Sequence, residues 1–211
     1  MAEDYSDRPV SRATLMEIQT DREVMEQGYQ FLDEKLVLLA QELLRRLRDY
    51  EERGRRYRDL EGRAREALAA AVARHGLDGL QVYPPADLGD ARLPRHGQTF
   101  LGVRLLSSEG LAAPPESGTT EVPFRPSREA RECAGLFREL AEEGAGLALA
   151  GANLHRLLAE YERTEQRAEA LSNVILPEIR QAQWRMSERI EEGEQEEAVR
   201  IRLFAPAGDG I

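Results

Sequence analysis

The sequence has few of the residues that disulfide-bonded, metal-binding or membrane-spanning proteins need. One cysteine, Cys133, excludes an internal disulfide and favours a reducing compartment. The three histidines, His75, His96 and His155, show no paired spacing with that cysteine, which argues against a zinc site. No apolar run approaches the ~20 residues that cross a bilayer, and the N-terminus lacks the basic and apolar regions of a signal peptide. These absences predict a cytoplasmic protein without metal or direct membrane insertion.

Aromatic residues are also scarce, and the chain carries no excess of positive charge. Aromatics make up 6% of the chain and apolar residues 41%, whereas charged residues reach 32%, a balance that favours long helices over a large compact core. The net charge of −10 weighs against a nucleic-acid partner, because affinity for phosphates comes from cations. The sequence contains no phosphate-binding loop, dinucleotide fingerprint or catalytic constellation. We therefore expect no cofactor and no enzymatic activity.

Proline is absent from two long stretches of the chain. None occurs between Pro9 and Pro84 or between Pro126 and Pro177, and seven of the ten prolines lie from Pro84 to Pro126. Because proline breaks helices, this distribution predicts a long helix, an irregular middle and a second long helix. The first helix is expected from about Ser11 to His75. The second is expected from Ser127, a plausible N-cap, to about Phe204.

Both predicted helices carry the 3.5-residue apolar repeat of a left-handed coiled coil. With Leu15 at position a, the a and d positions of the first helix are Leu15, Ile18, Arg22, Met25, Tyr29, Leu32, Leu36, Leu39, Leu43, Arg46, Tyr50, Arg53, Tyr57, Leu60, Ala64, Ala67 and Ala71. In the second helix they include Leu140, Leu147, Leu154, Leu157, Tyr161, Ala168, Leu171, Ile175 and Ala182. After Leu171 the stripe drifts to Ile179, Met186 and Ile190, so the register shifts near Pro177. The two stripes predict an antiparallel helical hairpin with both termini at one end.

The middle of the chain is predicted to form a small, loop-rich knob. It holds seven of the 17 glycines, and Gln98–Leu106 alternates enough to be a strand. Thr119–Phe124 is its expected partner in a small β-hairpin, although Pro123 restricts that segment to an edge. The predicted division is a coiled-coil helix over residues 1–75, the knob over 76–126, and a coiled-coil helix with its tail over 127–211. The predicted fold class is mostly α.

Three local patterns leave alternatives open. Arg45–Arg65 contains nine arginines and five acidic residues, which indicates either a surface for an acidic partner or, as we favour, a solvated face with Glu–Arg pairs. Glu188–Glu197 carries six glutamates and one arginine and is either a partner surface or a frayed helix end. The glycines of the second helix, Gly135, Gly144, Gly146 and Gly151, indicate close helix approach or a bend.

Three blocks of sequence resemble the D subunit of the V-type and archaeal-type ATPases. Ala170-Leu171-Ser172-Asn173-Val174-Ile175-Leu176-Pro177-Glu178-Ile179-Arg180 is similar to the family's late-helix signature of asparagine-alanine-leucine, a short apolar run, proline, one or two residues and isoleucine. Pro9-Val10-Ser11-Arg12 before Leu15 looks like its opening pattern. Glu26 to Lys35 looks like its block of glycine, two residues, a leucine pair and lysine. The blocks occur in the expected order at the two ends of the chain, and the resemblance is to a divergent bacterial member.

The resemblance implies a non-catalytic central rotor shaft. Such a shaft stands in a ring of catalytic and regulatory subunits and connects, through a small central-stalk subunit and a membrane-ring adaptor, to the ion-driven membrane ring. It would be peripheral at the cytoplasmic face of the membrane and would couple ion flow to ATP synthesis or hydrolysis. Residues expected to pack the shaft and to couple are Leu15, Ile18, Met25, Leu32, Leu171, Ile175, Pro177 and Ile179, with Pro177 bending the second helix. Phe100, Val103 and Leu105 are the candidates for binding the stalk partner.

Two other functions remain open from the sequence. A stand-alone antiparallel coiled-coil adaptor or scaffold would show the same heptads, and rotary ATPase genes beside this one would favour the shaft instead. An enzyme with an unrecognised site would require a polar pocket in the knob.

Overall fold

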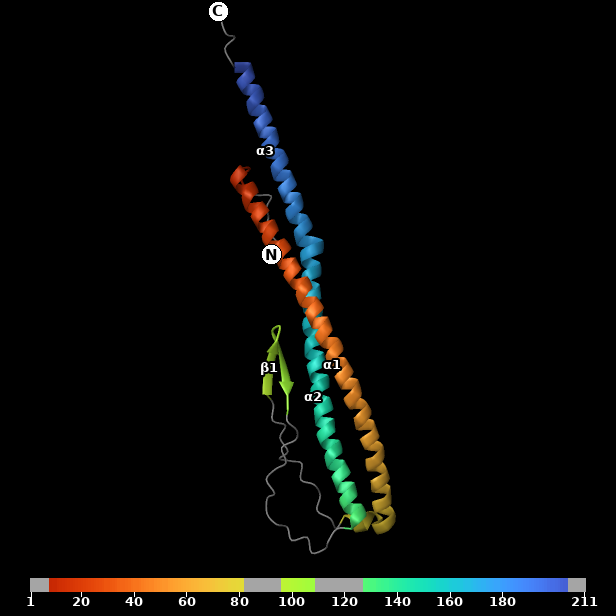
Figure 1. Cartoon of the computed structure of the whole chain (residues 1–211). Coiled ribbons are helices and arrows are strands. Elements are labelled where there is room, and N and C mark those ends of the chain that lie inside the picture. Colours follow the sequence, from red (N-terminus) through yellow and green to blue (C-terminus); the bar gives the residue numbers. More distant parts are fainter. Residues whose placement is uncertain (1–7, 82–95, 109–126, 205–211) are drawn as a thin grey trace, which may run out of the picture. The chain divides into compact units, whose positions relative to one another are not determined.

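The computed structural model describes residues 8–81, 96–108 and 127–204. Its elements are α1 (Arg12–Leu80), β1 (His96–Phe100), β2 (Val103–Ser107), α2 (Arg128–Ala170), the π-helical turn η2 (Leu171–Ile175) and α3 (Leu176–Phe204) (Figure 1). The predicted class, mostly α with long helices and a two-stranded antiparallel sheet, is confirmed. Helix α1 has 69 residues, and α2, η2 and α3 follow one another without a break. None of these helices is both long enough and apolar enough to span a membrane.

The ends of the long helices are set by local chemistry. Ser11 Oγ accepts a hydrogen bond from the backbone N–H of Thr14 at 3.1 Å, and Ser127 Oγ accepts one from Ala130 at 3.1 Å. Both serines therefore act as N-caps, as predicted for Ser127. Gly76 interrupts α1 with a φ of 70°, a conformation that favours glycine, directly after the predicted end at His75. One further helical turn then reaches Leu80.

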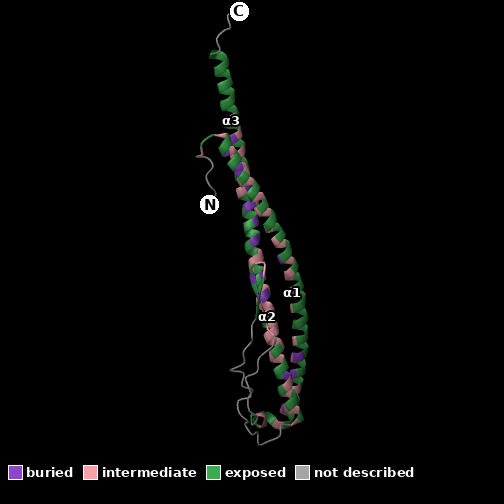
Figure 2. Cartoon of the chain, turned by 60° about the vertical axis from the view of Figure 1, so that its left-hand side comes forward, coloured by how far each residue is buried: buried purple, intermediate pink, exposed green. Residues whose placement is uncertain are grey.

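The chain divides into two compact units. Unit 1 comprises Met1–Val37 and Glu162–Ile211, and unit 2 comprises Leu38–Tyr161. In unit 1 the first part of α1 lies antiparallel to α3 (Figure 1), since Arg12 contacts Glu194 whereas Glu26 contacts Arg180. Residues 191–204 of α3 are all exposed (Figure 2). Both ends of the described chain therefore belong to the same unit.

In unit 2 the remainder of α1 lies antiparallel to α2. Leu39 and Leu157 are both fully buried in one cluster, Leu60 and Ala64 pack with Leu136 in a second, and Arg74 donates to Glu129 at 2.7 Å. All the buried positions of α1 in this unit lie at predicted heptad positions: Leu39, Leu60, Ala64 and Ala71. The heptad pattern therefore identified this seam correctly.

Glycines of α2 accommodate large side chains of α1. A Cβ atom at Gly144 would lie 3.1 Å from the ring of Tyr57, and one at Gly151 would lie 3.4 Å from that of Tyr50. One at Gly146 would lie 3.2 Å from the guanidinium of Arg53. Interhelical packing therefore explains these three glycines, because each leaves space for a large side chain of α1. Gly135 has nothing within 4 Å of such an atom, and the structure gives no reason for it.

Several arginines in the Arg45–Arg65 run pair along their own helix. Arg65 donates to Glu61 at 2.6 Å, Arg56 bonds Glu52, and Arg45 lies 3.7 Å from Asp49. This is the favoured alternative, a helix face with i, i+4 ion pairs. Arg46 and Arg53 differ, because they occupy heptad positions and line a polar pocket with residues of α2.

The β-hairpin is shorter than the sequence indicated. We predicted one strand over Gln98–Leu106, but the chain reverses inside that segment, and β1 pairs with β2 from His96↔Ser107 to Phe100↔Val103. Leu101 and Gly102 form the turn with φ values of 47° and 89°, the signs that a type I′ turn requires. The single-strand prediction was wrong because Gly102 supplies a tight turn. The proposed partner, Thr119–Phe124, lies outside the described residues.

Candidate functional site

The predicted shaft-packing residues gather mostly in the seam of unit 1. Ile18, Ile179 and Met186 form a buried cluster at 0%, 2% and 5% exposure. Leu15, Met25, Ile175 and Ile190 pack against it. Leu171 is buried, and its Cδ2 would lie 3.7 Å from a Cβ atom at Gly28. Leu32 is half-buried, and Pro177 is exposed.

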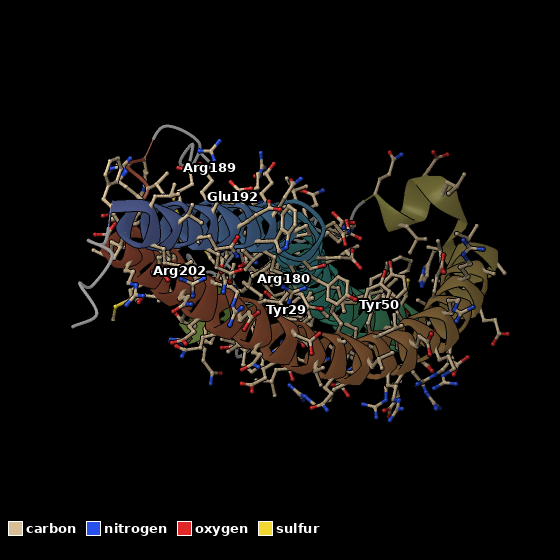
Figure 3. The ribbon with its side chains drawn as sticks, turned by 90° about the horizontal axis from the view of Figure 1, so that it is seen from above. Tyr29, Tyr50, Arg180, Arg189, Glu192 and Arg202 are labelled. Carbon is tan, nitrogen blue, oxygen red and sulfur yellow. The ribbon has the colours of Figure 1, made fainter. Side chains whose placement is uncertain are left out.

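A polar layer interrupts this apolar seam. Arg22, at an a position, donates from a terminal nitrogen to Gln183 Oε1 at 2.9 Å, and its Nε lies 3.8 Å from Glu26 Oε1. Glu26 also accepts from Arg180 at 3.2 Å. Charged side chains further along α3, among them Arg189 and Glu192, project from the ribbon (Figure 3). Polar pairs inside a coiled-coil seam reduce stability but fix which residues face one another.

The hairpin residues predicted to bind a stalk partner lie against the helices of unit 2. Val103 and Leu105 are buried at 7% and 3% exposure in one cluster with Leu39 and Leu157, and Phe100 packs against that cluster. Val103 and Leu105 thus hold the hairpin on the helix pair. The hairpin side chains left open to a partner include those of Gln98, Thr99 and Arg104. Binding of a stalk partner by the hairpin stays a prediction.

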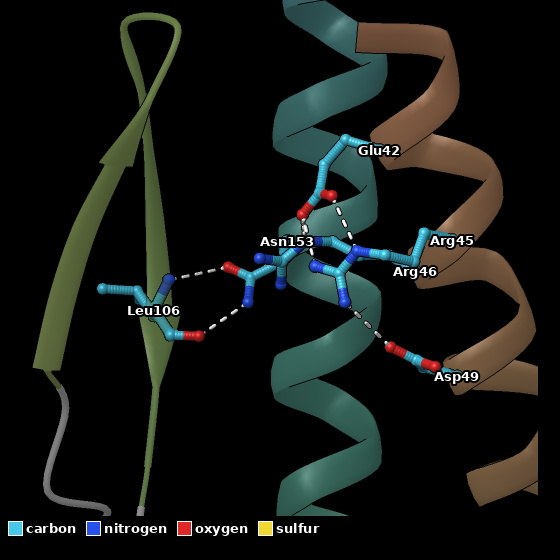
Figure 4. A network of polar contacts seen from close by, with 6 residues as sticks. All are labelled: Glu42, Arg45, Arg46, Asp49, Leu106 and Asn153. Atoms are coloured by element: carbon cyan, nitrogen blue, oxygen red, sulfur yellow. Dashed lines mark hydrogen bonds and ion pairs between the residues drawn. The ribbon is translucent and has the colours of Figure 1, made fainter. Parts of the chain in front are cut away.

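Asn153 of α2 fixes the hairpin by two hydrogen bonds (Figure 4). Its Oδ1 accepts from the backbone N–H of Leu106 at 2.9 Å, and its Nδ2 donates to the Leu106 carbonyl at 2.6 Å. Asn153 is 3% exposed, and Arg156 donates to the same Oδ1 at 3.1 Å. The side-chain amide thus pairs the backbone N–H and carbonyl of Leu106 on the outer edge of β2, as a neighbouring strand would. This residue was not predicted from the sequence, because nothing in a heptad pattern marks an asparagine whose partner is a distant backbone.

We expect Asn153→Asp to loosen the hairpin while leaving the helices paired. The aspartate still accepts from Leu106 N–H, but it places a negative oxygen against the Leu106 carbonyl where a donor stood. Losing one such bond and leaving the carbonyl without a donor costs about 1–3 kcal/mol. Hydrogen exchange should accelerate across β1 and β2 and stay unchanged in Leu60–Ala71. His155→Asp, an exposed neighbour on the same helix, is the control; equal effects of the two variants would contradict the assigned role.

A polar pocket adjoins the docked hairpin. It has a volume of about 420 Å³ and is lined by Arg46, Asp49, Arg53, Leu106, Ser107, Ser108, Glu142, Glu143, Gly146, Leu149, Ala150 and Asn153. Beside it, Glu42 accepts hydrogen bonds from Arg45 at 2.7 Å and from Arg46 at 2.6 Å (Figure 4). These bonds, chiefly that from Arg45, hold the pKa of Glu42 below its usual value. Two arginines and three carboxylates line the pocket, so it presents no single charge to a ligand.

Metal and thiol chemistry find little support in the described ranges. Among residues 8–81, 96–108 and 127–204, no group of three histidine, cysteine or acidic side chains is placed to hold a metal ion. Burial raises the pKa of the Cys133 thiol, which disfavours the reactive thiolate. The features that remain are therefore packing surfaces: the unit 1 seam and the docked hairpin.

Comparison with known proteins decides the family. Residues 14–205 match the family of the ATP synthase D subunit. The chain belongs to this ATP synthase family. A V-type ATP synthase D subunit of Anaeromyxobacter dehalogenans (strain 2CP-C) is 31% identical over 92% of this chain and 93% of its own length. The resemblance inferred from the sequence blocks is thereby confirmed.

More distant relatives extend the likeness beyond one genus. An A-type ATP synthase D subunit of Haloarcula marismortui is 26% identical over 91% of this chain and 84% of its own length. A V-type ATP synthase D subunit of Thermotoga neapolitana is 24% identical over 91% and 94%. This member of the D-subunit family therefore aligns with its relatives along both helical stretches and the segment between them.

Proposed function

We propose that this member of the D-subunit family is the central shaft of a V-type or archaeal-type rotary ATPase. The observation that carries the proposal is the family match over residues 14–205, which includes the helices of both units. A shaft must transmit torque through continuously packed helices. In each unit the helices pack antiparallel along an apolar seam, with Ile18 and Ile179 in one and Leu39 and Leu157 in the other.

In this role the chain is a non-catalytic component. Its partners are the catalytic and regulatory ring subunits, the small central-stalk subunit and the membrane-ring adaptor, and it lies peripherally at the cytoplasmic face of the cell membrane. The predicted division into helix, knob and helix is proposed to correspond to shaft, partner-binding region and shaft. Leu15, Ile18, Met25, Leu171, Ile175 and Ile179 keep the shaft together near the ring, and the hairpin face bearing Arg104 is the proposed stalk surface.

Affinity purification of the tagged full chain from its host tests the proposal directly. A shaft should bring down a nucleotide-hydrolysing ring and a membrane ion-translocating sector, and its gene deletion should abolish ion-driven ATP synthesis by membrane vesicles. Restoring the gene should restore synthesis. A coiled-coil scaffold, the alternative function, would purify without either assembly and leave synthesis intact.

Pro177→Ala is expected to keep or raise thermal stability while weakening the coupling of ion flow to ATP synthesis. Alanine restores an N–H group inside a helix, where proline costs ~3 kcal/mol, so the midpoint of thermal unfolding should be kept or raised. If Pro177 shapes the shaft so that it favours one catalytic interface at a time, ATP synthesis per assembled complex should fall. Complexes that assemble normally and couple as wild type would exclude a mechanical role for Pro177.

A further inference from the structure

The π-helical turn η2 joins two different heptad registers in unit 1. Before it, Thr164, Ala168 and Leu171 are buried, which places them at successive seam positions three and four residues apart. After it, the seam residues with the same alternating spacing are Leu176, Ile179, Gln183, Met186 and Ile190, of which Leu176, Ile179 and Met186 are buried. Continuing the first register would select Ile175, Glu178, Ala182, Arg185 and Arg189; Ile175 still packs against the seam cluster, but Glu178, Arg185 and Arg189 are exposed. The observed seam is thus displaced by one residue.

The unshifted register would be chemically unfavourable. It would turn the charged side chains of Glu178, Arg185 and Arg189, all now exposed, toward α1. It would also set Arg185 rather than Met186 in the apolar cluster with Ile18, where burying a charge is costly. The displacement instead buries apolar side chains and brings Gln183 to Arg22 at 2.9 Å. The sequence of α3 therefore requires one additional residue between the two registers.

The hydrogen bonding of the turn shows where that residue is accommodated. The N–H of Leu176 bonds to the carbonyl of Leu171, five residues earlier, instead of four. Pro177 follows at once and has no N–H to donate. Departing from the α pattern here therefore sacrifices fewer backbone hydrogen bonds than it would elsewhere in the helix. A single-turn π bulge is the known way for a helix to absorb one extra residue.

We infer that η2 is a register adapter: a one-residue insertion that rotates the apolar stripe of α3 into the seam of unit 1. Asn173 is exposed at the middle of the turn, and among the described contacts its side chain bonds only to the neighbouring Ser172. It is therefore the residue of η2 whose removal should disturb packing least. The inference concerns the folding of this chain and does not depend on the proposed rotary function.

Two single-residue deletions in the full-length chain distinguish an adapter from an ordinary helical segment. Deleting Asn173 should convert η2 to α-helix and leave both registers aligned, so the thermal midpoint stays within a few degrees of wild type or rises. Deleting Gln181, which is also exposed and lies in α3, should lower the midpoint by roughly 5 °C or more. Without Gln181, α3 cannot keep both the Leu176–Ile179 pair and the Met186–Ile190 pair in the seam.

Cross-linking supplies a readout of register that stability alone does not give. In a Cys133→Ala background, cysteines replacing Arg22 and Gln183 should be joined by a short bis-maleimide in the parent, and the yield should persist after deletion of Asn173. Hydrogen exchange around residues 171–178 should slow in that deletion, because the π turn is replaced by α-helix. A deletion of Asn173 that loses the cross-link, or destabilises as much as deletion of Gln181, would overturn the inference.

Discussion

Replacing Ile18 by aspartate is expected to destabilise unit 1 by about 3–5 kcal/mol. Ile18 is 0% exposed and forms the seam cluster with Ile179 and Met186, so a carboxylate there loses apolar burial and is itself desolvated. Thermal unfolding followed by circular dichroism should show a lower midpoint. Hydrogen exchange should accelerate in α3 around Ile179 and Met186.

The pH dependence of the Ile18→Asp variant provides an internal check. Burial raises the pKa of a carboxyl group above its unfolded value, so the penalty is largest at high pH and shrinks as the group is protonated. The variant should recover part of its stability between about pH 8 and about pH 5. Met16→Asp, at a site 67% exposed on the same helix, is the matched control. A comparable loss in that control would show that charge alone, and not burial, is responsible.

The second large effect is expected from Leu157→Ala in unit 2. Leu157 is fully buried beside Leu39, Val103 and Leu105, so it supports both the helix pair and the docked hairpin. Truncating a buried leucine costs about 2–5 kcal/mol through lost burial and the cavity that remains. The midpoint should fall by roughly 5–15 °C, and exchange in β2 should accelerate together with exchange in α1 near Leu39.

Leu158→Ala gives the comparison for that prediction. Leu158 is the next residue along α2 but is 44% exposed, so its truncation should cost less than about 1 kcal/mol. If both variants lose the same stability, the cluster does not hold the hairpin and helices together. If Leu157→Ala alone affects β2, the docking contact is confirmed.

The helices were predictable because their signals are local and periodic. Gaps in proline and the serine cap at Ser127 placed the helix ends within a few residues of those observed. The drift of the apolar stripe after Leu171 correctly indicated a change of register. Its form, a π turn ahead of Pro177, was not predicted, because sequence spacing shows that a residue is extra but not which hydrogen bonds accommodate it.

The candidate sites were less predictable because they depend on contacts between distant segments. Val103 and Leu105 were proposed to bind a stalk partner, yet their alternation equally suits burial, and the structure places them against Leu39 and Leu157. Asn153 was missed because its partner is the backbone of Leu106, which carries no sequence signal. Arg22 was assigned only as a heptad position, and its bond to Gln183 across the seam was not predicted.

The glycines that receive Tyr50 and Tyr57 have a consequence for axial sliding of the helices in unit 2. A slip of one heptad either way would keep the apolar stripes in contact, so the stripes alone do not oppose it. One direction would bring Phe137 against Tyr57 in place of Gly144, and the other would bring Leu158 against Tyr50 in place of Gly151. Each slip thus sets two bulky side chains where only one fits. Complementary sizes at these two levels therefore specify one axial alignment, which is what a helix pair needs in order to bear load along its length.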